Sequence, residues 1–65
     1  MNTKLIKLKD VIDITGLSRS FVYALAQKGD FPKPVKLSER SSAWVKSEVD
    51  DWIDARIATR DRRAA

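Results

Sequence analysis

The spacing of apolar residues along the chain predicts three short helices and one hairpin. Residues 5–8, Leu-Ile-Lys-Leu, are expected to form a short extended arm, and residues 9–14 have the length of a two-turn helix. Thr15-Gly16 closes that helix, because glycine adopts the left-handed conformation of a helix C-terminus with little strain.

A second helix is predicted between Ser18 and Lys28-Gly29. Ser18 is a good N-cap residue, and Val22, Leu25 and Ala26 recur at the three-to-four spacing of an amphipathic helix. Gly29 provides the same kind of terminator as the glycine that ends the first helix. The two predicted helices are therefore separated by a very short turn.

An extended connector and a β-hairpin are predicted after the second helix. Residues 31–34, Phe-Pro-Lys-Pro, are extended because each proline disfavours the helical conformation of the residue before it. Residues 35–37 and 43–45 flank the polar stretch 38–42, a pattern that favours two strands joined by a loop of about four or five residues.

The last part of the chain predicts a third helix. Ser47 stands three residues before Asp50, which resembles a capping box with Asp in the usual Glu or Gln place. Beyond Ala58 there is no apolar anchor, so residues 58–65 are expected to fray. The stripe that this helix would turn toward the core consists of Val49, Trp52, Ile53, Arg56 and Ile57.

The predicted order of elements is arm, helix, tight turn, helix, hairpin and helix. This order describes a winged helix-turn-helix, a mainly α fold with a small β-hairpin. We expect residues 1–65 to form one such domain, with its core in residues 5–57. Trp44, Trp52 and Phe31 are expected to close the core, because a stacking platform for single-stranded nucleic acid would gather several aromatics on one sheet face.

Composition excludes several kinds of chemistry. The 65 residues include no cysteine and no histidine, which removes thiolate nucleophiles, histidine bases and Cys/His zinc sites. Nothing pairs a nucleophile with a base, so we predict a protein that is not an enzyme and that takes no cofactor or metal. No apolar run approaches the ~20 residues of a membrane span, and we expect a cytoplasmic protein.

The positive charge belongs to the first two thirds of the chain. Thirteen Lys and Arg residues against nine Asp and Glu residues give a net charge of +4. Residues 1–46 hold nine basic and four acidic side chains, a net of +5, whereas residues 47–65 hold four and five, a net of −1. The basic segment is expected to bind a polyanion.

The outer face of the second helix is the strongest candidate for a DNA-binding surface. If Val11, Leu17, Val22 and Leu25 pack between the two helices, polar side chains remain outside, close to a helix N-terminus that favours phosphate. The alternative is an ordinary capped, solvent-facing helix. The residues of this helix that we expect to contact DNA are Ser18, Arg19, Ser20, Tyr23, Gln27 and Lys28.

The hairpin provides a second candidate surface, in which two cations stand among small hydroxyl residues. Such a wing could lie along a phosphate backbone or place Arg40 in a minor groove, and the alternative is an ordinary solvated turn. An arginine in this position indicates phosphate binding more strongly than a lysine does, because its planar guanidinium group can hold a phosphate with two hydrogen bonds. The candidate residues are Lys36, Ser38, Arg40, Ser41 and Ser42.

Several motifs in order resemble the AlpA family of phage-type transcriptional regulators over residues 5–56. They are Thr15-Gly16-Leu17-Ser18-Arg19-Ser20, Val22-Tyr23, the stretch from Gly29 to Leu37, Arg40, Trp44 and the stretch from Glu48 to Ile53.

This resemblance implies a small winged-helix DNA-binding protein related to MerR-type DNA-binding domains and phage excisionases. It places the recognition helix on residues 18–28, with Arg19, Ser20 and Tyr23 as expected DNA contacts, and the wing on residues 37–43. Two positions depart from the family pattern: Ser38 stands where glycine is frequent, and Ile12 stands where a small residue is frequent.

Three functions follow from these patterns. The first is a sequence-specific regulator of transcription that binds double-stranded DNA and is nucleoid-associated when bound; the resemblance implies that it is of the prophage or mobile-element type. The second is an excisionase-like directionality factor that bends attachment-site DNA. The third is a protein-interaction adaptor that uses the acidic face of the last helix at Asp50, Asp51 and Asp54. Besides DNA, the candidate partners are an integrase, RNA polymerase or another copy of the chain.

Overall fold

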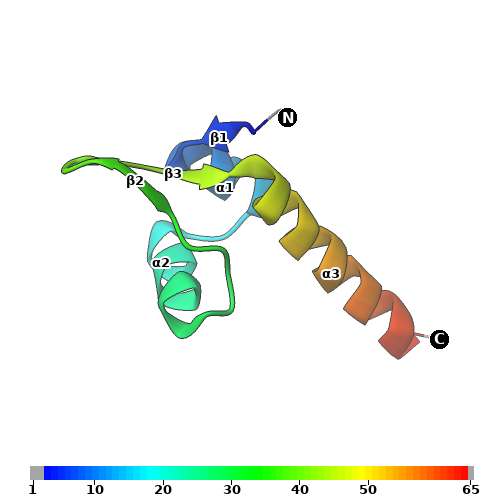
Figure 1. Cartoon of the computed structure of the whole chain (residues 1–65). Helices are drawn as coiled ribbons and strands as arrows, with labels where there is room; N and C mark the ends of the chain where they lie inside the picture. The colour runs from blue at the N-terminus through cyan, green and yellow to red at the C-terminus, as the bar shows by residue number, and fades with distance from the viewer. Residues whose placement is uncertain (1–2, 65) are drawn as a thin grey trace.

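The computed structural model describes residues 3–64 and arranges them as helices around a small antiparallel sheet (Figure 1). Met1, Asn2 and Ala65, which belong to the predicted domain, lie outside the described residues. The predicted fold class, mainly α with a hairpin, is confirmed. The elements are β1 (Leu5–Ile6), α1 (Leu8–Thr15), α2 (Arg19–Lys28), β2 (Val35–Ser38), β3 (Ser41–Val45) and α3 (Lys46–Ala64).

The first half of the predicted N-terminal arm, Leu5–Ile6, is a strand of the sheet, whereas Leu8, predicted to belong to the arm, is the first residue of α1. The strand order is β1-β3-β2, and β1 pairs antiparallel with β3, so that Ile6 lies opposite Trp44. The backbone amide of Lys46 donates a hydrogen bond to the carbonyl of Lys4 at 2.8 Å, which continues this pairing into the first residue of α3. The arm therefore ties the start of the chain to the hairpin.

The hairpin differs from its prediction in the length of its loop. Ser38 pairs with Ser41 and Lys36 with Ser42, so the loop is reduced to Glu39 and Arg40. An irregularity in register between Lys36 and Ser38 absorbs the extra residue, Leu37, in the manner of a β-bulge. The predicted loop of four or five residues is wrong, because polar serines extend the backbone ladder as well as apolar residues do.

Both ends of α2 and the end of α1 are formed as the sequence predicts. Gly16 and Gly29 adopt φ angles of 74° and 85°, in the left-handed region that favours glycine. The Gly16 amide donates to the carbonyl of Ile12 at 2.8 Å, and the Asp30 amide donates to that of Leu25 at 2.9 Å. Each of these bonds satisfies a carbonyl near the end of its helix that would otherwise lack a partner.

The start of α3 differs from its prediction. It begins at Lys46, directly after β3, so Ser47 lies inside the helix and is not its N-cap. Lys46 donates from its Nζ atom to Asp50, one turn later, at 2.9 Å. Residues 58–64, which the sequence predicts to fray, continue the helix, and Thr59 donates its hydroxyl to the carbonyl of Ala55 at 3.0 Å. Good helix-forming residues carry this last segment without apolar anchors.

The core lies between the sheet and the three helices. The predicted packing of Val11 and Val22 is confirmed, since both are fully buried, and Leu17 and Leu25 pack against them. Ile57 was predicted to belong to the core stripe of α3, but it is 43% exposed, because α3 by then extends beyond the other elements (Figure 1). The buried residues are Ile6, Val11, Val22, Ala26, Phe31, Ala43, Trp44 and Val49.

Two indole groups hold the connector between α2 and β2. Trp44 is fully buried, and its Nε1 atom donates to the carbonyl of Pro32 at 3.0 Å. Trp52 donates from Nε1 to the carbonyl of Asp30 at 2.6 Å, and its ring meets that of Phe31 edge-on at 4.9 Å. The expectation that Trp44, Trp52 and Phe31 close the core is confirmed.

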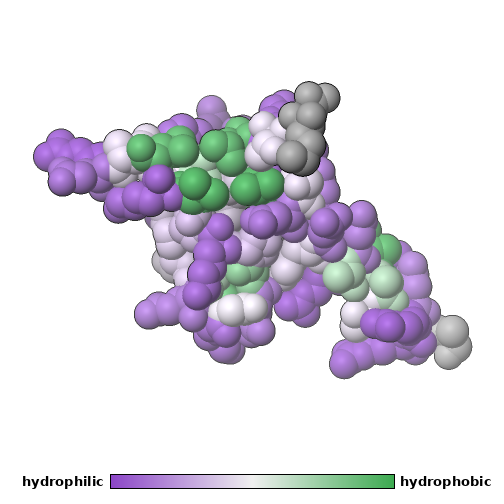
Figure 2. Space-filling view, viewed as in Figure 1, coloured by the Kyte–Doolittle hydropathy of each residue, from purple (hydrophilic) through white to green (hydrophobic). Residues whose placement is uncertain are grey.

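The sheet leaves part of its apolar surface open to solvent. Leu5, Val35 and Leu37 are each about two-fifths to one-half exposed, and Figure 2 shows apolar residues gathered over the region of the sheet. Within residues 3–64, no helix has the combination of length and apolar character that crossing a membrane would require.

Replacing residues at the two ends of the predicted apolar stripe of α3 should change the stability of the fold by different amounts. Val49 is fully buried and Ile57 is 43% exposed. We expect Val49→Ala to lower the free energy of unfolding by about 2 kcal/mol, and Ile57→Ala by less than about 0.5 kcal/mol. Urea denaturation followed by circular dichroism measures both changes, and equal losses would contradict the assigned core.

Candidate nucleic-acid interface

Thr15 fixes the turn between α1 and α2. The sequence predicted it only as part of the end of the first helix. The Thr15 hydroxyl donates to the carbonyl of Val11 at 2.7 Å and accepts a hydrogen bond from the amide of Leu17 at 3.2 Å. Ser18 then caps α2, since its hydroxyl accepts from the amide of Phe21 at 3.2 Å. These bonds set the direction in which α2 leaves the turn.

One long face of α2 is exposed and polar. All six candidate residues of the second helix are exposed, as predicted. Arg19 makes no ion pair or side-chain hydrogen bond within residues 3–64, whereas Lys28 lies 4.0 Å from the carboxylate of Asp30. Phe21 is 50% exposed although nothing in the sequence pattern distinguished it, and it lies on the flank of α2 that also carries Leu25.

The hairpin presents fewer free groups than the sequence suggested. Lys36, Ser38 and Arg40 are exposed, and Arg40 stands in the two-residue turn at the tip. Ser41 and Ser42 are half-buried in β3, and the Ser41 hydroxyl accepts a hydrogen bond from Nζ of Lys7 at 3.0 Å. A serine engaged in this way is less available to a ligand than one in an open loop.

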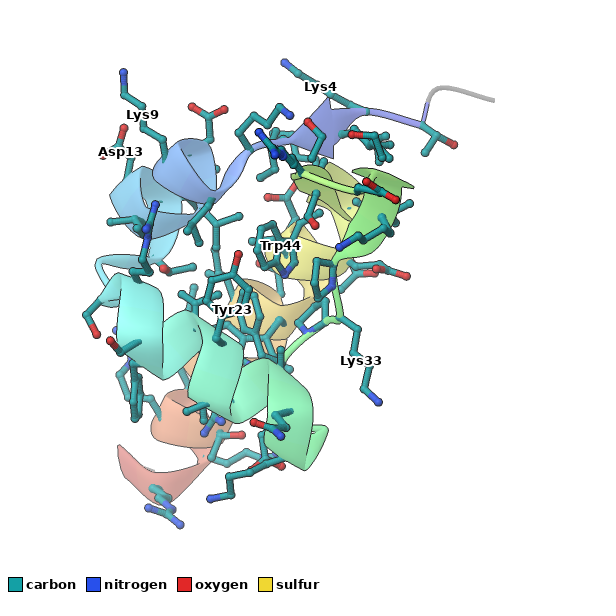
Figure 3. All side chains as sticks on the ribbon, turned by 90° about the vertical axis from the view of Figure 1, so that its left-hand side faces the viewer. Lys4, Lys9, Asp13, Tyr23, Lys33 and Trp44 are labelled. Carbon is teal, nitrogen blue, oxygen red and sulfur yellow. The ribbon has the colours of Figure 1, made fainter. Side chains whose placement is uncertain are left out.

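Helix α2 and the hairpin tip lie on the same side of the molecule. In Figure 1 both lie to the left, while α3 runs away to the lower right. Figure 3 views this side directly and shows α2 in front. The two elements that carry the predicted DNA-contacting residues therefore lie on the same side of the molecule. A surface shared by both elements for one large ligand requires this.

A groove lies between α2 and the connector. One wall comes from α2 and the other from the connector, and the groove is lined by Tyr23, Ala26, Gln27, Lys33 and Pro34. Lys33 and Pro34 were not among the predicted site residues. Residues 31–34 were predicted only as an extended connector, and only the return of the chain past α2 places Lys33 and Pro34 beside Tyr23.

Trp44 supports both walls of this groove. On the α2 side, the Tyr23 ring meets the Trp44 ring edge-on at 5.8 Å and 61°, and Figure 3 shows the two side chains next to each other above α2. On the connector side, Trp44 holds the carbonyl of Pro32. Because Trp44 is fully buried, the spacing of the two walls is set by the core.

Several cations on this side are free, and one acid, Glu39, stands beside Arg40 in the hairpin turn. Arg19, Lys33, Lys36 and Arg40 make no ion pair within residues 3–64. The early acids of the last segment stand on α3, which leads away from α2 and the hairpin (Figure 1). Among the described residues, no set of three acidic side chains converges in a way that could hold a metal ion.

Three helices with a small antiparallel sheet, and a tight turn between α1 and α2, are consistent with a small DNA-binding domain of the helix-turn-helix or winged class. The chain belongs to the family of the prophage CP4-57 regulatory protein (AlpA), whose family model matches residues 4–57. The resemblance drawn from the sequence motifs is therefore confirmed.

Two relatives extend this comparison. The chain is 42% identical over 59 residues to the uncharacterized protein ORF88 of Enterobacteria phage P4, an alignment that covers 91% of this chain and 67% of the phage protein. It is 29% identical over 59 residues to the DNA-binding transcriptional activator AlpA of Escherichia coli strain K12, covering 82% of this chain and 84% of that protein.

Capping of α2 can be tested separately from any binding. We expect Ser18→Ala to lower the free energy of unfolding by about 1 kcal/mol, because the amide of Phe21 loses its acceptor. Ser20→Ala is the matched control: Ser20 lies exposed inside α2, and its replacement should change stability by less than about 0.5 kcal/mol. Urea denaturation compares the two variants, and equal effects would contradict the assigned cap.

Proposed function

We propose that this protein is a sequence-specific double-stranded DNA-binding regulator of transcription, of the prophage or mobile-element type. In this proposal α2 enters the major groove, and the hairpin contacts the adjacent backbone or minor groove. The observation that carries it is that the exposed polar face of α2 and the hairpin tip with Arg40 lie on one side of the molecule (Figure 1).

The face of α2 has the chemistry that direct readout of bases needs. An α-helix fits the major groove of B-form DNA, where arginine pairs with guanine and glutamine with adenine through two hydrogen bonds each. Arg19 stands in the first turn of α2 and Gln27 in the last, both exposed. The capped N-terminus also turns backbone amides and the positive end of the helix dipole toward a phosphate.

The hairpin supplies a contact of a different kind. Arg40 at the tip and Lys36 on β2 are free cations, which suit phosphates or a narrow minor groove. Such contacts add affinity to every DNA sequence and fix the orientation of α2, but they carry little base information. Specificity and general affinity are thus assigned to separate elements.

The comparisons support this proposal. The family model is that of a prophage regulatory protein, one relative is named as a DNA-binding transcriptional activator, and another comes from a phage. A small binding domain affects transcription through the place where it binds or through a partner. An integrase, RNA polymerase or a second copy of the chain bound to DNA would provide that partner.

The proposal predicts a strong dependence of DNA affinity on salt. About five to seven phosphate contacts from the basic side give a slope of about −5 to −6 for the logarithm of the association constant against that of salt concentration. Fluorescence anisotropy titrations on a duplex at several salt concentrations measure this slope. A slope near zero would contradict DNA binding through this surface.

Arg19 and Arg40 should affect DNA binding in different ways. Selection from a random duplex pool identifies the preferred site, and titrations then compare that site with a scrambled duplex. We expect Arg19→Ala to cost about 1–3 kcal/mol on the preferred site and to relax discrimination. Arg40→Ala should weaken both duplexes evenly. Unchanged discrimination in the Arg19 variant would exclude it from base readout.

Two further experiments separate the alternatives drawn from the sequence. An excisionase-like factor shares the DNA interface but bends its site strongly, which a circular-permutation bending assay detects. An adaptor would bind its protein partner through Asp50, Asp51 and Asp54 of α3. It would keep this binding when Arg19 and Tyr23 are replaced by alanine, and would lose it when the three acids are replaced by basic residues.

A further inference from the structure

We propose that the groove between α2 and the connector holds the DNA backbone strand that separates the major-groove contact from the hairpin contact, with Lys33 as its phosphate ligand. This inference rests on the proposed function and names the ligand of one part of its surface: a phosphodiester. It also gives the extended connector a role in binding.

The position of the groove is the first argument. In duplex DNA, a sugar–phosphate strand always lies between a major groove and the neighbouring minor groove. A protein that places one element in each must leave a passage for that strand. The groove lined by Tyr23, Gln27, Lys33 and Pro34 runs beside α2, and the connector that forms its other wall leads directly into β2 of the hairpin.

The chemistry of the lining is the second argument. Lys33 is exposed and makes no ion pair or hydrogen bond within residues 3–64, and Figure 3 shows it extending from the connector into solvent. Tyr23 and Gln27 add a hydroxyl and an amide on the other wall, and both can donate to a phosphate oxygen. No carboxylate lines the groove.

Charge pairing near the groove strengthens this assignment. The acidic residue just before the connector, Asp30, lies 4.0 Å from Nζ of Lys28, so its charge is partly balanced outside the groove lining. Ala26 and Pro34 are small or apolar and leave room beside the charged group for a deoxyribose. The lining therefore fits an anionic strand better than a cationic or purely apolar ligand.

Rigidity is the third argument. The Tyr23 ring packs edge-on against Trp44, and the same Trp44 holds the Pro32 carbonyl next to Lys33. Both walls are fixed to one buried side chain before any ligand arrives. Preformed walls lose less conformational entropy on binding than flexible ones.

The test compares two variants that remove the same charge. Lys33→Gln removes the cation of the groove, and Arg63→Gln removes one from the far end of α3, on the other side of the molecule (Figure 1). We expect Lys33→Gln to reduce the steepness of the salt slope by about 0.9 and to weaken the preferred and scrambled duplexes by the same factor. Arg63→Gln should leave the slope unchanged.

Tyr23→Phe provides a second, independent variant. The substitution keeps the ring against Trp44 and removes only the hydroxyl, so the fold is retained. We expect a loss of affinity that is equal for the preferred and scrambled duplexes. A loss confined to the preferred duplex would assign Tyr23 to a base and would overturn its place in a phosphate groove.

The phosphate itself can be located with neutral methylphosphonate linkages placed one at a time along the preferred duplex. At one linkage between the two contacted grooves, the neutral substitution should lower the affinity of wild-type protein. The affinity of Lys33→Gln should be the same with and without that substitution, because this variant already lacks the contact. If wild-type protein binds no duplex, the proposed function fails together with this inference. If it binds DNA steeply with salt but Lys33→Gln behaves like Arg63→Gln, this inference alone is overturned.

Discussion

The burial of Trp44 is the constraint on which the rest of the structure depends. A tryptophan removes about 200 Å² from water, which corresponds to about 5 kcal/mol of transfer free energy and is a large share of what a domain of this size can gain. Its indole lies in β3, contacts Tyr23 of α2 and holds the connector at Pro32. Sheet, helix and connector are thus positioned by one side chain.

This arrangement separates the tasks of stability and binding. The residues that stabilise the fold are apolar and lie between the sheet and the helices, and no polar or charged residue among those described is buried. The free cations Arg19, Lys33 and Arg40 lie outside this core and take no part in it. Each can therefore be replaced to test binding with little effect on folding, which is what the proposed function requires.

Local signals determined which parts of the structure could be predicted from sequence. Gly16, Ser18 and Gly29 act within one turn of their own positions, and the helix ends they predict are found in the structure. The hairpin loop was placed wrongly because Ser38, Ser41 and Ser42 pair in the ladder, which their polar character did not indicate. The start of α3 at Lys46 follows directly on β3, which pairs with β1 forty residues earlier in the chain, and a local serine pattern carries no signal of that pairing. Lys33 was missed for the same reason, because its neighbour across the groove belongs to another element.

The central claim is that α2, the connector and the hairpin form one DNA-binding surface that excludes α3. An NMR titration of the isotopically labelled protein with its selected duplex tests this claim most directly. The account predicts that amide shifts concentrate in residues 18–28, in residues 33–42 and around the Trp44 indole, while residues 50–64 change little. Shifts concentrated in α3, with α2 unaffected, would contradict it.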